Sequence, residues 1–469
     1  MSADSLLLAL VLLLFAALIV RRQRTLARPV RLALLGHLGL WAVWPLTYVL
    51  LDATAREESV AQPHFPLVVV AHVACLLAVV AGVILLPARA VDWVGRTSVG
   101  TRPLTDRTVR LWLALAVTVV IPLRIWQFQT VGGDFLSLIS ANVGTEKSEL
   151  GAVTAITAVA VVGTSFAMAV VASDNQMSLR GATRWWGYAT LVVLAMQQVI
   201  FGTRAFLLTP VLGGILLLAP RWQRLSRTRK LTSVALGAML LAIAAPVALV
   251  LGAARGVQGA EREAATEAAA LLGELTPAEQ AQLTVRAAYV KFDALGTGAS
   301  LIARDGTEFA GWQPITSALL APIPRLLLPN KPVPTSFNGE QSGIPYVRAA
   351  LDYGDIDLGM VVPVSASAVM LWELGYGGLP LFVFVNVLTL RFADAMLRSR
   401  SVLLGGFGIV LLAFPTFEYV VQPVAGIIRD GLRIGLYFLL ATGALLFARR
   451  DRVEAGNADS SASTAMPAD

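Results

Sequence analysis

Apolar segments of membrane-spanning length alternate with short polar connections along most of the chain. A helix needs about 20 consecutive apolar residues to cross a bilayer, and slightly shorter ones suffice. Because lipid offers no partner for free backbone amides, each such segment must be helical. The pattern predicts eleven spans, near residues 5–20, 31–51, 66–87, 110–127, 151–172, 185–202, 205–220, 231–253, 377–394, 402–418 and 431–448.

One long polar loop, residues 254–376, interrupts this pattern. Within it, residues 276–279 read Thr-Pro-Ala-Glu, a capping box with proline at the first helical position. The apolar stripe that follows, ending at Ala294, predicts an amphipathic helix, and the Ala- and Glu-rich stretch from Gly259 to Leu275 predicts another. We expect both helices to lie on the membrane surface or to cap a cavity. The prolines from Pro314 to Pro345 predict an irregular but stiff segment.

Composition agrees with an all-α, polytopic membrane protein. Hydrophobic residues make up 56% of the chain, charged residues 14%, and the mean hydropathy is +0.70, whereas soluble domains carry about a quarter charged residues. The net charge of +7 does not indicate nucleic-acid binding, because the cations cluster in short connections beside apolar segments. Cys75 is the single cysteine, which excludes disulfides within the chain and cysteine-based metal sites.

Basic residues gather in alternate connections, at 21–31, 89–110, 180–184, 221–230, 391–400 and 449–452. Basic connections stay in the cytoplasm, so the intervening ones, including the long loop, are predicted to face outward. Basic residues follow the first span and none precedes it, the reverse of a secretory signal peptide, so we expect a retained span with its amino end outside. The chain then divides into spans one to eight (1–253), the long loop (254–376), spans nine to eleven (377–450) and a cytoplasmic tail (451–469) that we expect to be disordered.

Cations on the outward side are scarce, which makes them candidates for function. Arg204 ends a tight turn between two spans, and Arg255 directly follows span eight. Arg325 and Lys331 flank three leucines in the proline-rich segment, where a stiff backbone leaves little entropy to lose on binding. Arginine has forked, permanently charged donors that suit phosphate oxygens. The set predicts an outward cavity for a phosphorylated or pyrophosphorylated ligand, although each cation also fits ordinary anchoring at the lipid interface.

Four further residues join the predicted binding set. Arg429 and Arg433 are four residues apart at the outer start of span eleven, hence on one helical face. Cations at a helix amino end oppose the macrodipole, which indicates an anionic partner. Arg286 and Tyr289 lie on the amphipathic helix of the long loop and are predicted to contact the same substrate.

Acidic candidates for a proton acceptor are few. Glu373 lies where the long loop re-enters the membrane, Asp293 on the amphipathic helix and Glu418 at the outer end of span ten. A carboxylate near apolar surface suits proton transfer, but each also fits a structural partner of a nearby arginine. The three histidines lie outside the long loop without the spacing of a metal site. A divalent cation in the first external loop is a weaker alternative, with ligands Asp52, Glu57 and Glu58.

Several of these motifs together resemble the bacterial oligosaccharide repeat-unit polymerases of the Wzy-type O-antigen polymerase family. The Gly-Thr-Arg turn at 202–204 is similar to that family's small-residue-plus-arginine turn, and Arg255 fits the arginine after the next span. The most specific element is Ile-Pro-Arg-Leu-Leu-Leu-Pro-Asn-Lys-Pro at 323–332. Glu-Leu-Gly-Tyr-Gly at 373–377 is similar to the family's acidic-Gly segment. The resemblance covers roughly residues 110–435.

The resemblance implies a GT-C-type membrane glycosyltransferase in the bacterial cytoplasmic membrane. It would move a growing glycan from undecaprenyl pyrophosphate onto a second lipid-linked repeat unit, outside the membrane and without metal or other cofactor. It assigns Arg204, Arg255 and Arg325 to the pyrophosphate or carrier, with Lys331 supporting them, and makes Glu373 a proton acceptor or an arginine partner. The implied partners are the undecaprenyl-pyrophosphate-linked oligosaccharide, membrane lipids, a chain-length regulator and a flippase, but no nucleic acid.

Three alternatives stay open. The related ligases use a histidine in the long loop, which this chain lacks there. Other polyprenyl-phosphate sugar transferases place their main loop and an acidic pair after the first span, where this chain has only a short connection. Transporters favour broken helices and polar groups at the membrane midplane, often in repeated halves. Here the mid-span positions are nearly free of charge, and the long loop has no counterpart in the other half.

Overall fold

The computed structural model describes about half of the chain. The described segments are 2–51, 64–87, 106–130, 181–200, 294–305, 311–320, 346–353, 356–399, 402–416 and 424–428, with shorter pieces at 90–91, 93, 167, 226–228, 230–231, 274–276, 278–280, 323, 328, 431–432 and 435. For the hairpin 346–363, only the backbone is described.

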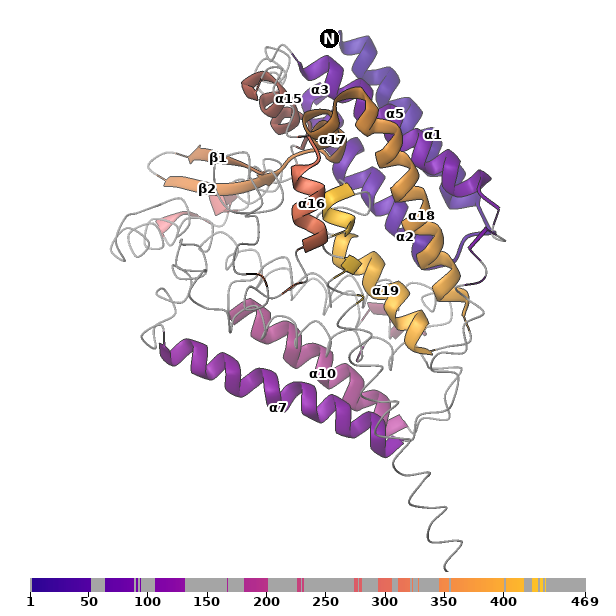
Figure 1. Ribbon diagram of the computed structural model, residues 1–469. Helices are drawn as coiled ribbons and strands as arrows, with labels where there is room; N and C mark the ends of the chain where they lie inside the picture. Colours follow the sequence, from indigo (N-terminus) through magenta and orange to yellow (C-terminus); the bar gives the residue numbers. More distant parts are fainter. Residues whose placement is uncertain are drawn as a thin grey trace, which may run out of the picture.

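The described part is almost entirely helical (Figure 1). Its helices are α1 (Ala3–Arg22), α2 (Arg28–Leu38), η1 (Gly39–Val43), α3 (Trp44–Leu51), α5 (Phe65–Leu85), α7 (Asp106–Thr130), α10 (Gly181–Ile200), α15 (Ala294–Asp305), α16 (Gln313–Leu320), α17 (Ala366–Leu374), η5 (Gly375–Gly377), α18 (Gly378–Arg398) and α19 (Val402–Thr416). α2, η1 and α3 run on as one helix with a π-helical turn, in which the Trp44 N–H donates to the Gly39 carbonyl.

Within the described residues, five helical segments are long and apolar enough to cross a membrane: 3–22, 28–51, 65–85, 109–126 and 366–398. They coincide with the predicted spans near 5–20, 31–51, 66–87, 110–127 and 377–394, and they identify a multi-pass membrane protein. α10 and α19 are helices at two further predicted spans. The spans predicted near 151–172, 205–220, 231–253 and 431–448 fall wholly or almost wholly outside the described residues, so the count of eleven stays a prediction.

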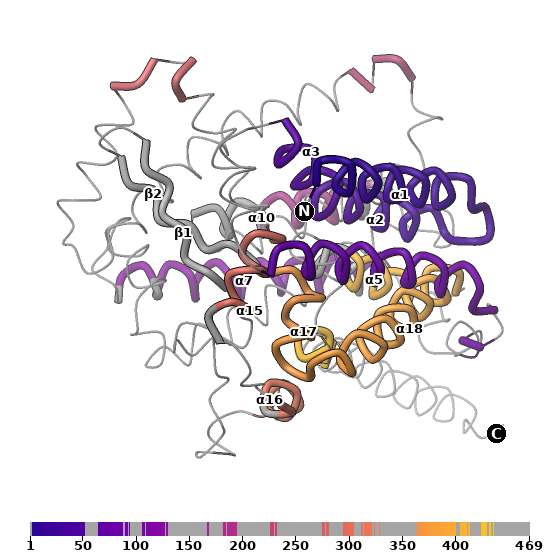
Figure 2. The backbone as a smooth tube through the Cα atoms, turned by 90° about the horizontal axis from the view of Figure 1, so that it is seen from above, coloured from indigo at the N-terminus to yellow at the C-terminus, as the bar shows by residue number. Residues whose placement is uncertain are grey.

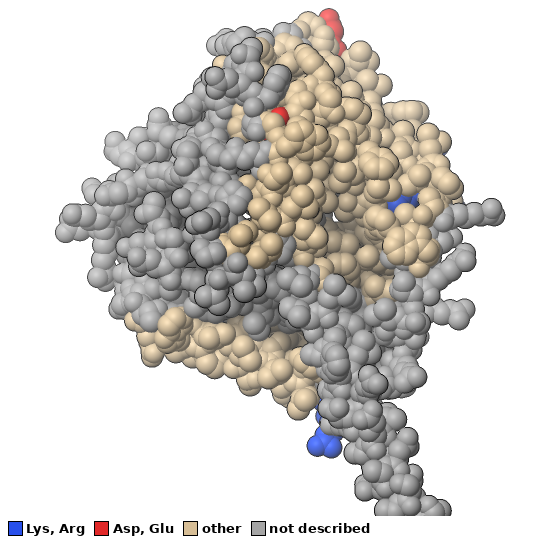
Figure 3. Space-filling view, viewed as in Figure 1, with Lys and Arg blue, Asp and Glu red and all other residues tan. Residues whose placement is uncertain are grey.

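α1 shows why the bundle suits lipid. The helix begins where the hydroxyl of Ser2 accepts a hydrogen bond from the Ser5 N–H, at 3.3 Å. One stripe, from Leu6 to Val20, is buried in the bundle, yet Leu8 and Phe15 on the other side are 60% and 62% exposed. A helix that is apolar all round needs an apolar solvent on its outer side. The outer surface of the bundle is similarly apolar. Figure 3, seen from the same direction as Figure 1, shows few Lys, Arg, Asp or Glu side chains on the described part of the surface.

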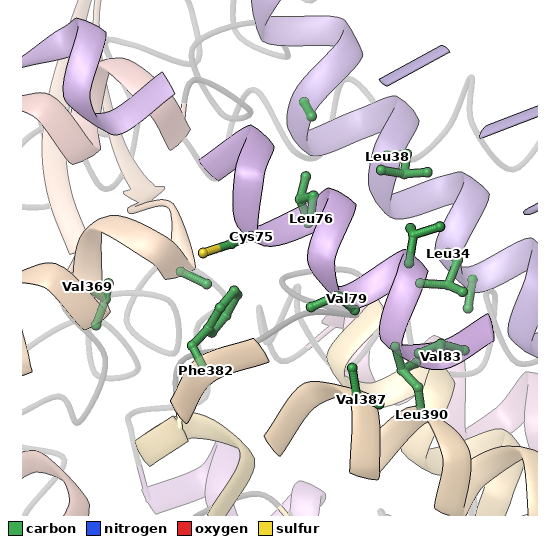
Figure 4. Close-up of a cluster of buried hydrophobic side chains, with 14 of the residues drawn as sticks. Leu34, Leu38, Cys75, Leu76, Val79, Val83, Val369, Phe382, Val387 and Leu390 are labelled. Carbon is green, nitrogen blue, oxygen red and sulfur yellow. The ribbon is translucent and has the colours of Figure 1, made fainter. Parts of the chain in front are cut away.

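α5 is the central helix of the main bundle. Figure 2 shows it between α1–α3 on one side and α17–α18 on the other. In Figure 4, Val79 and Val83 of α5 lie beside Val387 and Leu390 of α18, within one continuous buried cluster. Gly82 makes this approach possible, because a Cβ there would lie 2.6 Å from Val387 Cγ2. Small residues let membrane helices pack closely.

Asp394 joins three connections at one end of this bundle. Its Oδ1 accepts from the Ala27 N–H at 2.6 Å, and its Oδ2 accepts from Arg391 at 3.4 Å and from Arg398. Arg391 also donates to the Leu86 carbonyl. The α1–α2 connection, the end of α5 and the end of α18 therefore meet, which agrees with the prediction that their basic connections face the same side. Which side of the membrane that is stays a prediction.

The long loop contains a β-hairpin that the sequence pattern did not predict. β1 (Tyr346–Tyr353) pairs antiparallel with β2 (Ile356–Pro363), with Tyr346 opposite Pro363 and Tyr353 opposite Ile356. A usable signal was present, since Gly354-Asp355 between two runs of strand-forming residues is a hairpin dipeptide. The hairpin projects beside α15 and contacts it (Figure 1). Apart from this hairpin, the all-α class holds for the part of the chain that the structure describes.

Other expectations for the long loop are partly confirmed. The capping box forms: the Thr276 N–H and hydroxyl donate to Glu279 Oε2 at 2.8 and 2.7 Å. Both bonds lower the pKa of the Glu279 carboxyl, and the bond from the Thr276 hydroxyl has the larger effect. The helix predicted after it begins as expected, because residues 278–280 are helical, and its continuation over 281–293 lies outside the described residues. The expectation of an irregular segment after Pro314 is wrong at its start, because α16 covers 313–320 with that proline in its first turn, where proline is tolerated.

α15 belongs to the long loop but lies inside the bundle rather than on its surface. Residues 294–299 are all buried, and the helix contacts both α5 and α17. Its sequence, Ala-Leu-Gly-Thr-Gly-Ala-Ser, supplies the small side chains that close packing needs. A Cβ on Gly298 would lie 2.8 Å from Ser365 Oγ and 2.9 Å from Ala368 Cβ. The loop is thus docked into the membrane-spanning core.

We expect Gly298→Ala to lower the stability of the protein by about 1–3 kcal/mol, because the added methyl overpacks the contact with α17. Gly36→Ala in α2 is the matched control, since a Cβ there meets nothing within 4 Å. Thermal unfolding in detergent, followed by tryptophan fluorescence, compares the two. Equal melting temperatures for both variants would show that α15 is not packed as described.

Candidate functional site

Of the predicted site residues, only Glu373 falls in the part of the chain that the structure describes. The others lie outside the described residues: Arg204, Arg255, Arg286, Tyr289, Arg325, Lys331, Arg429 and Arg433. Asp293 and Glu418, the other two acidic candidates, also lie outside them. The candidate site is therefore built around Glu373 and the segments that surround it.

Glu373 lies near the end of α17, a short helix with almost every residue buried. The Ser365 hydroxyl caps its amino end by accepting from the Ala368 N–H at 3.4 Å. The Glu373 side chain is 1% exposed, and no described group makes a hydrogen bond to its Oε2. A buried carboxyl oxygen without a hydrogen bond is costly, so a group outside the described residues, water or a ligand is expected to meet it.

Two glycines form the sharp turn that follows Glu373. Gly375 ends α17 with φ +61°, a backbone region that side chains with a Cβ rarely adopt. Gly378 begins α18, and a Cβ there would lie 2.5 Å from the Met370 carbonyl oxygen. The glycines of the Glu-Leu-Gly-Tyr-Gly-Gly motif at 373–378 therefore let the chain fold back on α17 and enter the next span.

Three segments distant in sequence meet at α17. The Ala294 carbonyl of α15 accepts from the Ser365 N–H at 2.9 Å. The Gly311 N–H, in the turn before α16, donates to the Glu373 carbonyl at 2.8 Å. The Val424 N–H approaches Met370 Sδ at 3.4 Å. The long loop and the segment before span eleven thus converge on the helix that carries Glu373; Arg429 follows the described residues 424–428 directly in sequence.

Two buried histidines, His72 beside the first turn of α17 and His37 in α2, were not selected by sequence reasoning. His72 of α5 has Nδ1 3.1 Å from the Ser367 hydroxyl oxygen, and both side chains are buried. His37 of α2 is buried as well. Among the described residues, His37 has no hydrogen bond to either ring nitrogen. The sequence shows both histidines inside predicted spans, but the contact of His72 with Ser367 comes from the fold.

Arg124 is a third residue that sequence reasoning missed. It lies in the predicted span near 110–127 and is 1% exposed, the largest of the fully buried side chains described. A charged residue inside a membrane-spanning segment is a functional candidate by default. Its signal is plain in the sequence, because Arg124 interrupts the apolar run Ile-Pro-Leu-Arg-Ile-Trp at 121–126.

The described residues contain no group of three or more His, Cys, Asp and Glu side chains arranged to hold a metal ion. The chemistry available at α17 is that of one enclosed carboxyl group at the end of the long loop. Such a group can exchange a proton with a hydroxyl or pair with a guanidinium. No protein-family model, no curated protein and no solved structure matches this chain.

Proposed function

We propose that the chain is a glycosyltransferase that polymerises undecaprenyl-pyrophosphate-linked oligosaccharide repeat units at the outer face of the bacterial cytoplasmic membrane. One observation supports this most: the Gly311 N–H, in an earlier part of the long loop, donates to the Glu373 backbone carbonyl, so the turn before α16 lies against the helix that carries an enclosed carboxyl group. The motifs around Arg204, Arg255 and Arg325 carry the resemblance to the O-antigen polymerase family. A GT-C-like arrangement of eleven spans is part of the proposal.

The proposed orientation places the Asp394 end of the bundle in the cytoplasm. The connections that meet there are rich in Arg, and such connections stay inside. The amino end and α17 then lie toward the outer face, and the carboxyl end lies in the cytoplasm. A lipid-linked donor reaches an outward site by lateral diffusion in the membrane.

In the proposed reaction, a hydroxyl oxygen of the acceptor sugar bonds to the anomeric carbon of the growing glycan. The bond from that carbon to the carrier's pyrophosphate oxygen breaks, and its electron pair leaves with the pyrophosphate. Arg204, Arg255 and Arg325, supported by Lys331, stabilise the charge that develops there. The hydroxyl proton passes to Glu373. In a second version of the proposal, Glu373 does not accept the proton but pairs with one of these arginines.

Replacing Arg204, Arg255 or Arg325 by alanine in the native host tests the proposal. Removing one donor to a developing anion lowers turnover by about 10²–10³-fold, so polymer should shorten or vanish while single lipid-linked units accumulate. Arg227→Ala is the control, because Arg227 is exposed and lies in a connection predicted to be cytoplasmic. Normal chain length in all three variants, at normal protein level, would refute the proposal.

A transporter of lipid-linked saccharide is the second candidate, favoured by the buried Arg124, His37 and His72 within spans. The arginine variants also distinguish a transporter from a polymerase. Loss of transport leaves lipid-linked units on the cytoplasmic face of the membrane. Loss of polymerisation leaves them outside, where an enzyme added to intact spheroplasts can reach the glycan.

A further inference from the structure

α16 belongs to the long polar loop, yet it is apolar on two opposite sides. Ile315 and Ala318 are buried in the hydrophobic core that α5, α17 and α18 share. On the other side, Trp312 at the start of the helix and Leu319 near its end are 61% and 51% exposed. Ile323, just after the helix, is 37% exposed. A helix in water has a polar outer face, whereas the outer face of α16 carries large apolar side chains.

The sequence around α16 has the composition of a segment inside a membrane. Residues 309–324 contain no Lys, Arg, Asp or Glu. The run is too short to cross the bilayer as a helix, which takes about 20 residues, and its length suits a segment that enters the membrane and returns. Exposed apolar side chains that lie close together mark a contact with a partner or with lipid.

The fold places α16 against the outside of the membrane-spanning bundle. The hydrogen bond from the Gly311 N–H to the Glu373 carbonyl, 2.8 Å long, holds the start of α16 at α17. Figure 2 shows α16 at the edge of the described bundle, with α17 between it and α5. In Figure 1, α16 is level with the first half of α18 and not beyond the end of that helix. α17 and α18 form one membrane-spanning candidate, 366–398, and Phe384 on α18 is 60% exposed. The exposed side of α16 therefore continues a surface that faces lipid.

The backbone at both ends of α16 has hydrogen-bond partners within the protein. The Thr316 N–H donates to the Trp312 carbonyl at 2.9 Å, and the Ile323 N–H donates to the Leu320 carbonyl at 3.1 Å. Backbone at membrane depth needs such partners, because lipid offers none.

We propose that α16 is inserted into the membrane beside α17 and α18, with the side that carries Trp312 and Leu319 against the acyl chains of the bilayer. The long loop is then an extramembrane segment with one element anchored in lipid. This inference does not depend on the proposed function, because it requires a membrane but no substrate.

Spin labelling of the full-length protein in liposomes of phosphatidylethanolamine and phosphatidylglycerol tests this. Cys75→Ala removes the single cysteine, and a nitroxide is then attached to Leu319→Cys. EPR power saturation measures collisions of the nitroxide with O₂, which concentrates in lipid, and with a water-soluble nickel chelate. We expect the ratio of O₂ to nickel collisions at 319 to match that of Phe384→Cys on α18. It should exceed the ratio of Glu274→Cys, at an exposed polar position of the same loop.

Ala318→Cys, on the buried side of α16, is the internal control and should be shielded from both reagents. A ratio at 319 as low as that at 274 would place α16 in water and overturn the inference. Shielding of 319 from both reagents would mean that protein covers it, from elsewhere in the chain or from a second copy, and would overturn the inference too. The liposomes contain no polyprenyl carrier, so a lipid-like ratio identifies the bilayer itself as the partner.

Discussion

Asp394→Ala is expected to lower the free energy of unfolding by about 3–5 kcal/mol, because it leaves the buried charge of Arg391 without its carboxylate. The side chains of Asp394 and Arg391 are 2% and 4% exposed, so water cannot replace the lost partner. The substitution also removes the acceptor for the Ala27 N–H and for Arg398. The α1–α2 connection would lose its bond to α18, and Arg391, which binds the Leu86 carbonyl at the end of α5, would lose the carboxylate that positions it.

Unfolding in mixed micelles at increasing SDS measures this loss. Glu274→Ala is a suitable control, because Glu274 is exposed and its removal should change little. The double variant Asp394→Leu with Arg391→Met should recover most of the stability, since apolar side chains of similar volume can replace a buried ion pair without net loss. A single variant as stable as the wild type would mean that Asp394 does not hold these helices together.

The spans that the structure describes were predictable because their information is local. A run of about 20 apolar residues is long enough to cross the bilayer. It must be helical there, because lipid offers no hydrogen-bond partners for the backbone. The capping box at Thr276 and Glu279 was predictable for the same reason, since its partners are three residues apart. The meeting of three basic connections at one end of the bundle was also predictable. The chain crosses the membrane alternately in the two directions, so every second connection lies on the same side. The ion pairs of Asp394 with Arg391 and Arg398 are three and four residues apart on one helix and were visible locally, whereas its hydrogen bond from the Ala27 N–H was not.

Contacts between distant segments were not predictable. Nothing in the Ala- and Gly-rich sequence of α15 distinguishes a surface helix from one inserted between α5 and α17. The approach of His72 to Ser367 joins residues 295 apart in sequence. Arg124 is a different case, because the sequence shows a charged residue inside an apolar run. It lies near the end of its span, however, where an arginine usually extends its side chain to the lipid headgroups. Glu373 was selected because it lies where the long loop re-enters the membrane. The structure shows in addition that its side chain is buried.

Glu373→Gln is expected to slow polymer growth by about 10²–10⁴-fold, the usual contribution of a positioned proton acceptor. Glutamine has nearly the same shape, and the hydrogen bond from Gly311 goes to the backbone carbonyl, so the docking of the loop should persist. No described group bonds to Oε2, so the amide breaks no described hydrogen bond at that oxygen. Purified protein with lipid-linked repeat units, sampled over time on gels, gives the rate.

The two proposed roles of Glu373 predict different accompanying changes. A proton acceptor acts only during transfer, so Glu373→Gln should keep its melting temperature and its affinity for undecaprenyl pyrophosphate. An arginine partner holds a buried cation, so its loss should lower the melting temperature and change that affinity as well. Glu274→Gln, the same chemical change at an exposed position, controls for the loss of one charge. Full polymerisation by Glu373→Gln would exclude both roles and move the search for the proton acceptor to Asp293 or Glu418.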